Sequence, residues 1–121
     1  MIKRGQLVRH ISHKYFAIVL AIFPTKRRAS IIDLHTFRIR NIDINELEPY
    51  DPNGGFGGGG ARPIPIFTDS EIDALSELIN INGGSLGTEE IRYRRPEHLA
   101  VYNKVLRLRD SLTQSKVRAY V

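Results

Sequence analysis

The chain has 121 residues, no cysteine and a formal net charge of +5. This length suits one ordinary domain, or one very small domain with an appendage. Without cysteine, disulfides, thiolate zinc sites, iron–sulfur clusters and cysteine nucleophiles are excluded. We therefore expect an intracellular or virion-interior protein rather than a secreted one. Residues 1–5 carry no apolar signal region, and the longest apolar run, residues 15–23, is far short of the roughly 20 residues that span a bilayer.

The positive charge is confined to the first half of the chain. Residues 1–50 hold nine Lys/Arg and four Asp/Glu, whereas residues 51–121 hold nine of each. Such asymmetry favours an acidic partner for the first half, either nucleic acid or an acidic protein face. The alternative is that the charge only keeps a small domain soluble.

Short β-rich runs fill the first 50 positions. The longest, residues 15–23, is apolar on both faces, so we expect a central strand covered on both sides. Residues 37–40 alternate apolar and basic side chains, so one face of that expected strand is solvated. The other expected elements are strands at residues 6–9 and 29–34 and a turn or short helical turn within residues 41–47, capped by Asp43 or Asn45.

The arrangement of these runs resembles an SH3-like barrel of the type found in KOW domains and small bacteriophage proteins. The resemblance covers residues 4–50 and is carried by the runs 5–9, 16–22, 29–34, 37–40 and 45–48. The chain departs from the pattern at Ala17, where such barrels often have glycine. The resemblance implies a small barrel at residues 1–50, with one core that contains Val8, Ile18, Leu20, Ile31 and Leu47.

A linker rich in glycine and proline follows, over residues 51–66. Its glycine cluster lacks the Lys and Ser/Thr of a phosphate-binding loop, and no helix follows it directly, so a nucleotide site is not expected. Phe56 is the only large side chain among the glycines, and Arg62 follows them. We call this linker the strap. If it passes between partner subunits, these two residues are candidates for partner contacts.

The tail, residues 67–121, is expected to be α-helical. Thr68 and Glu71 form a capping box at the start of the first helix, which should end within residues 80–84. Pro96 is a preferred first position for a second helix. The expected apolar stripe of that helix is Leu99, Tyr102, Val105 or Leu106, and Leu112. The pattern assigns no element to residues 85–95. The predicted fold class is therefore α+β.

No motif for catalysis or for a cofactor stands out. The His10-x-x-His13 spacing suits a metal, but without thiolates or a definite carboxylate partner we interpret these as surface histidines. No acid–base pair and no nucleophile motif is organised, so we expect no enzyme, no cofactor and no small-molecule substrate.

The basic residues are the strongest functional candidates. On a barrel, several of them could form one patch that binds nucleic acid or an acidic partner, with Tyr15 or Phe37 adding base stacking. The alternative is a solvated rim around a small barrel. The candidates are Lys3, Arg4, Arg9, Lys14, Lys26, Arg27, Arg28, Arg38 and Arg40.

Two functional hypotheses follow from the sequence. In the first, the chain is a non-catalytic structural or adaptor protein of a larger assembly, such as a bacteriophage virion, and binds neighbouring subunits through strap and tail. In the second, it is a KOW-like accessory protein that binds RNA or DNA through the basic barrel face. The strap and the neutral amphipathic tail favour the first hypothesis, whereas the charge asymmetry favours the second.

Overall fold

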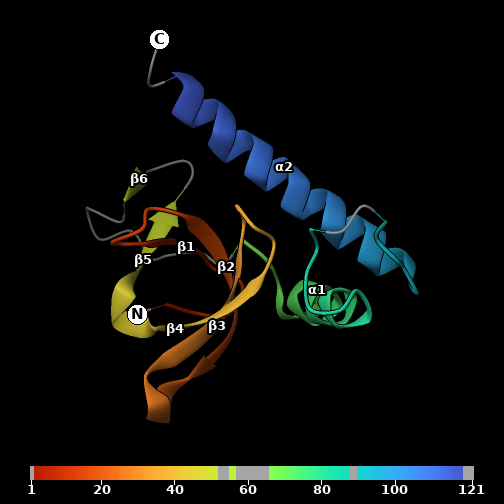
Figure 1. Cartoon of the computed structure of the whole chain (residues 1–121), viewed down its shortest axis with the longest axis horizontal. Coiled ribbons are helices and arrows are strands. Elements are labelled where there is room, and N and C mark those ends of the chain that lie inside the picture. Colours follow the sequence, from red (N-terminus) through yellow and green to blue (C-terminus); the bar gives the residue numbers. More distant parts are fainter. Residues whose placement is uncertain (1, 52–54, 57–65, 88–89, 119–121) are drawn as a thin grey trace.

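The structure is a computed structural model that describes residues 2–51, 55–56, 66–87 and 90–118. It is an α+β chain in which a curled antiparallel sheet is followed by two helices (Figure 1). The sheet order is β4-β3-β2-β1-β5-β6. The elements are β1 (Leu7–His10), β2 (Phe16–Phe23), the 3-10 turn η1 (Pro24–Lys26), β3 (Arg28–Asp33), β4 (Ile39–Asp43), the 3-10 turn η2 (Ile44–Glu46), β5 (Leu47–Asp51), β6 (Gly55–Phe56), α1 (Asp69–Ile81) and α2 (Pro96–Arg118).

The turn η2 forces the sheet to curl. It joins β4 to β5, which lie four strand spacings apart in the sheet order. In a flat sheet these strands would be about 19 Å apart, yet the few residues between them reach at most about 14 Å when fully extended. The expected cap is confirmed, since the Asp43 side chain accepts a hydrogen bond from the Asn45 amide at 2.8 Å. Among the described residues, no backbone ladder pairs β4 with β5, so the sheet is open between these two strands.

The two faces of β2 bury their side chains in different hydrophobic clusters. Ala17 and Val19 pack inside the curled sheet, in a cluster with Val8, Ile31 and Leu47. Ile18 and Leu20 belong to a second cluster, which both helices share with the outer face of the sheet. The expectation of a central strand covered on both sides is confirmed, but the single core that was to unite Ile18 and Leu20 with Val8, Ile31 and Leu47 is wrong, because neighbouring side chains on a strand point to opposite faces.

The third and fourth strands are joined by a turn that differs from the expected one. The strand β4 begins at Ile39, not at Phe37. Phe37 has a left-handed backbone conformation with φ of 58°, and its amide donates to the Asp33 carbonyl at 2.7 Å. Its ring is buried in the cluster shared with the helices, so Phe37 is not the exposed stacking residue that the sequence analysis considered.

The start of α1 is held as the sequence predicts. The Thr68 hydroxyl accepts from the Glu71 amide at 3.2 Å, and the Glu71 carboxylate accepts from the Thr68 amide at 2.9 Å. This confirms the capping box, which replaces lost backbone partners at the helix start. The helix ends at Ile81 with Asn82 as its C-cap, within the expected range.

The helix α2 begins at Pro96 as expected but buries a different face. Its core side chains are His98, Val101, Val105 and Leu112, whereas Leu99 is 48 % exposed. The expected stripe through Leu99 is therefore wrong at its first position. The buried face differs from the expected one because it includes the fully buried His98, whereas the expected stripe was drawn from apolar and aromatic residues. His98 accepts from the Arg94 amide at 3.1 Å and lies 3.1 Å from the Glu77 carboxylate, which joins α2 to α1.

Within the described residues, neither helix has the length and apolar character needed to cross a membrane. The side chain of Phe56 and the whole of Arg62 lie outside the described part of the chain, as does most of the linker over residues 51–66. Among residues 85–95, which the sequence left without an element, Ser85 forms an isolated bridge with Arg38.

Candidate anion-binding site

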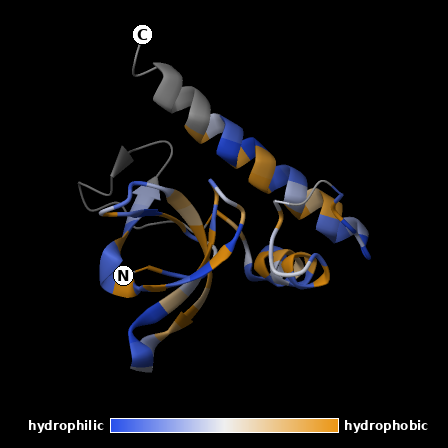
Figure 2. Ribbon diagram, in the orientation of Figure 1, coloured by the Kyte–Doolittle hydropathy of each residue, from blue (hydrophilic) through white to orange (hydrophobic). Residues whose placement is uncertain are grey.

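The basic residues of the first half do not form one patch. Lys26, Arg27 and Arg28 lie at the turn between β2 and β3, the hydrophilic end of that hairpin (Figure 2). Lys3 precedes β1 at the same end of the sheet, because β1 and β2 are antiparallel. Arg9, Lys14, Arg38 and Arg40 lie toward the opposite end of β2, near the turns that precede β2 and β4. The turns that carry the two groups lie at opposite ends of β2, about 23 Å apart.

Several of the candidate cations already have partners inside the fold. The Arg4 guanidinium contacts Asp69 and Asp73 at the start of α1, and its Nε donates to the Leu20 carbonyl at 2.9 Å. Arg28 donates from Nε to the Asn41 side chain at 2.6 Å. Arg40 donates to the buried Asp33 carboxylate at 2.9 Å. These three side chains stabilise the fold, so their charges are less available to a ligand.

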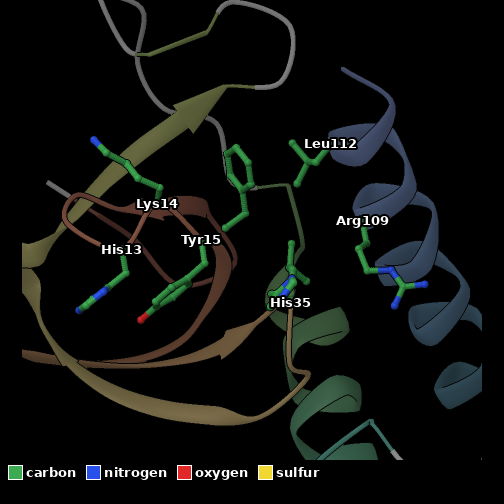
Figure 3. A pocket seen from close by; sticks show the side chains of 8 residues that line it. His13, Lys14, Tyr15, His35, Arg109 and Leu112 are labelled. Atoms are coloured by element: carbon green, nitrogen blue, oxygen red, sulfur yellow. The ribbon is translucent and has the colours of Figure 1, made fainter. Parts of the chain in front are cut away.

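A pocket of about 440 Å³ lies between the sheet and the last turns of α2 (Figure 3). We call it the α2 pocket. Its polar side chains come from three segments: His13, Lys14 and Tyr15 before β2, His35 after β3, and Arg109 on α2. Its apolar side chains are Phe16, Leu34 and Leu112. None of the described residues that line it is acidic, so the pocket favours an anionic ligand.

The side chains that line the α2 pocket differ in how deeply they are buried. Leu34 and Leu112 are buried, Phe16 and Arg109 are half-buried, and His13, Lys14 and His35 are exposed. The pocket therefore has an apolar bottom and a polar entrance that carries the positive charge of Lys14. Figure 3 shows Leu112 directed from α2 toward the sheet, with His35 between the two, and the Lys14 side chain extended away from α2.

The turn before β2 is held by its own hydrogen bonds. Lys14 adopts a left-handed conformation with φ of 64°, and its amide donates to the His10 carbonyl at 2.9 Å. The buried His10 ring accepts from the His13 amide at 3.0 Å and stacks on Tyr15 at 5.0 Å between ring centres. His10 is thus a turn-forming residue and not the surface histidine that the sequence indicated. Within the described residues, no group of three or more metal-ligating side chains could hold an ion.

The turn after β3 is organised by the buried carboxylate of Asp33. It accepts from the His35 amide at 2.7 Å and the Thr36 amide at 3.3 Å, besides Arg40. The backbone that carries His35 is therefore fixed. Arg109 reaches the same region from α2, where its guanidinium lies 4.8 Å from the centre of the Phe37 ring.

Tyr15 supplies a neutral hydroxyl beside these cations. Burial raises the pKa of the Tyr15 phenol; Arg40 acts against this, while Asp33 and Glu46 add to it. The hydroxyl therefore stays protonated at neutral pH and can donate a hydrogen bond to an anion. The Arg40 guanidinium lies 5.4 Å from the centre of the Tyr15 ring, which places one more cation close to the α2 pocket.

No family model, curated protein or solved structure matches this chain. Its function must therefore be argued from the site itself.

Of the basic candidates named from the sequence, Lys14 lines the α2 pocket. The sequence did not indicate that Arg109, Leu112, His13 and His35 belong to the same site. The spacing of Arg109 and Leu112 places them on neighbouring positions of a helix, yet nothing local states which turn of the sheet that helix covers. The histidines were weighed only as metal ligands or surface residues.

Proposed function

We propose that this protein is a non-catalytic nucleic-acid-binding protein that holds its ligand at the α2 pocket. The observation that carries the proposal is the composition of this pocket: the cations Lys14 and Arg109 and two histidines surround aromatic and apolar side chains, and no described residue that lines it is acidic. Phosphates attract lysine and arginine regardless of sequence. Aromatic and apolar surface beside them suits the faces of bases.

The closed SH3-like barrel is part of this proposal. Two features support it, namely the pairing of β1 with both β2 and β5 and the short turn η2 that draws β4 toward β5. A barrel of this kind would keep the turns before β2 and β4 at one end. The cations at the β2–β3 hairpin, Lys26, Arg27 and Arg28, would then add long-range attraction from the other end.

Binding of fluorescent RNA and DNA of mixed sequence, followed by anisotropy between about 50 mM and about 200 mM salt, tests the proposal. Lys14→Asn removes one pocket charge, and asparagine tolerates the left-handed backbone at this position. We expect weaker binding to all sequences and a salt slope smaller by about 1. Lys26→Asn, which removes one charge at the far end of β2, is the matched control and should change the affinity less. If neither nucleic acid binds in low salt, the proposal fails.

The second candidate function is the adaptor of a larger assembly, such as a phage virion. It is favoured by apolar side chains that remain outside the core: Leu99 is 48 % and Tyr93 42 % exposed, and the Tyr93 ring contacts Tyr102 of α2. Against it, most of the apolar face of the tail is already buried on the sheet of the same chain. An adaptor would therefore need this exposed flank, or the strap with Phe56 and Arg62, for its partners.

Purification of tagged protein with its bound partners tests the adaptor function. Leu99→Ser should lose a partner that the unchanged protein retains, without a change in melting temperature. Ile11→Ser removes another exposed apolar side chain, 41 % exposed and carried by the turn between β1 and β2, and serves as the control. If both variants retain the same partners, the α2 flank has no role in assembly.

A further inference from the structure

The α2 pocket differs from a plain basic surface in one respect, its apolar bottom. A surface that binds only phosphates needs cations and has no use for buried carbon. Here Phe16, Leu34 and Leu112 line the same cavity as the cations. A ligand that filled the pocket would therefore need both an anionic group and a flat or apolar group.

We propose that the α2 pocket takes one unpaired nucleotide of a single strand, with its base against Phe16 and Leu112 and its flanking phosphates toward the turn of His13 and Lys14 on one side and toward Arg109 on the other. This inference rests on the proposed function and narrows its ligand to single-stranded RNA or DNA. The pocket volume of about 440 Å³ is in the range of sites that hold one small molecule, about 300–1,000 Å³.

A duplex cannot use the bottom of this pocket. Its bases stay stacked and paired inside the helix, so only its phosphates would meet the entrance cations, and Phe16 and Leu112 would gain no contact. A base must leave the stack before it can enter a protein pocket, which costs a few kcal/mol in a duplex and much less in a single strand. The apolar bottom thus discriminates between the two forms, whereas the charges do not.

The walls of the α2 pocket are set before any ligand arrives. The turn that carries His13 and Lys14 is closed by hydrogen bonds to His10, and the turn that carries His35 is closed by Asp33. A backbone that is already fixed loses little conformational freedom on binding. The neutral Tyr15 hydroxyl adds a hydrogen-bond donor at the cationic side.

The chain has no tryptophan, which gives the proposal a direct probe. Phe16→Trp places a single indole at the bottom of the pocket, and Phe23→Trp places one at the exposed far end of the same strand. Oligothymidylate of about 12 nucleotides, long enough for a small binding site, should quench the indole of the first variant and leave that of the second unchanged. The melting temperature of each variant shows whether that variant is folded.

Affinity completes the test. The unchanged protein should bind the single strand at least about tenfold more tightly than the same sequence annealed to its complement, the size expected from one stacked base. Phe16→Leu keeps an apolar side chain but removes the ring, and should lower single-strand affinity about fivefold without changing duplex affinity. Phe23→Leu is the matched control.

Each contrary result has its own meaning. Equal affinity for single strand and duplex, or no quenching in Phe16→Trp, overturns the single-nucleotide pocket while the nucleic-acid function stands. Displacement of the oligonucleotide by polyglutamate of equal charge, with the indole quenched to the same extent, overturns it in favour of an acidic protein segment. Binding of neither nucleic acid overturns the proposed function itself.

Discussion

The carbonyl oxygen of Phe67 lies 2.2 Å from the point where a Cβ atom on Gly5 would be. The Gly5 carbonyl in turn accepts from the amides of Ile66 and Phe67, both at 3.0 Å. Gly5 has φ of +86°, a conformation that other residues adopt at a cost. The segment that leads into α1 is thus bonded directly to the start of the sheet, and only a residue without a side chain permits this approach.

Gly5→Ala should destabilise the whole protein and not only its first strand. Gly83 provides the control, since it has a similar φ of +76° but no atom within 4 Å of a built Cβ. Gly83→Ala should cost about 1–2 kcal/mol for the backbone alone. Gly5→Ala should cost clearly more in urea unfolding, because the Phe67 carbonyl must also move. Equal losses in the two variants would show that the junction between sheet and helix is looser than these contacts imply.

The carboxylate of Glu71 makes stability depend on acid pH. It accepts from the Thr68 amide and from the Lys104 ammonium, each at 2.9 Å. Burial acts to raise the pKa of Glu71, but the hydrogen bonds from Thr68 and Lys104 outweigh it and hold the pKa below its ordinary value of 4.5. The folded state therefore binds this proton less readily than the unfolded state.

The sign of the effect follows from this lowered pKa. The contribution of Glu71 to stability is fully present above its unfolded pKa and is lost as pH falls through the folded value. We expect the melting temperature to fall below about pH 4.5, and Glu71→Gln should remove part of this acid dependence. Glu97→Gln, at an exposed position in the first turn of α2, should leave the acid dependence unchanged. The same acid slope in all three proteins would contradict the assigned role.

His98 is a third test, because it is a polar side chain with no exposed surface. It satisfies the Arg94 amide and lies against Glu77, whose carboxylate also contacts Arg95 at 3.2 Å. His98→Leu leaves that amide and part of the carboxylate without their partner, a loss of about 1–3 kcal/mol. His35→Leu replaces an exposed histidine and should stay within about 0.5 kcal/mol in the same urea titration. If His98→Leu does not change the free energy of unfolding, packing alone joins the two helices.

Local signals predicted the helices better than the strands. The capping box at Thr68 and the proline at Pro96 act through backbone groups within one helical turn, so a short window of sequence contains them. The left-handed turn at Phe37 depends instead on the burial of its ring in a cluster that includes residues of the distant tail. A local pattern of alternating residues therefore placed the start of β4 two residues early.

The candidate site was only half visible in the sequence for a related reason. The charge excess of residues 1–50 identified Lys14 as a candidate. A count of charges does not show where the residues lie in space, so the sequence grouped Lys14 with Lys26, which lies at the other end of β2. Arg109 and Leu112 enter the pocket only because α2 packs across the sheet. Most of the charged residues in the tail are balanced by acids, so nothing in its composition distinguished Arg109.

The alternation of β2 between two clusters leads to the last prediction, which concerns residues 1–51 as a separate fragment. The resemblance to a small barrel implies that this part could fold alone. In the structure its outer face packs Leu7, Ile18, Leu20 and Ile32 into the cluster that contains the buried side chains of both helices and their leading segment. Removal of the tail would expose all four, and each loses about 1.5–3 kcal/mol of burial.

A fragment of this size has little stability with which to offset such a loss, since small domains bury only about 60 % of their surface. We expect residues 1–51 to lack a cooperative melting transition and to give poorly dispersed amide resonances, whereas the full chain should melt in one transition. Replacing the four exposed side chains by threonine, which suits a solvated strand face, should restore partial folding if the inner cluster around Val19 is self-sufficient. A fragment that melts cooperatively without these changes would mean that the inner cluster alone holds the sheet, and that the helices are an addition to a complete barrel.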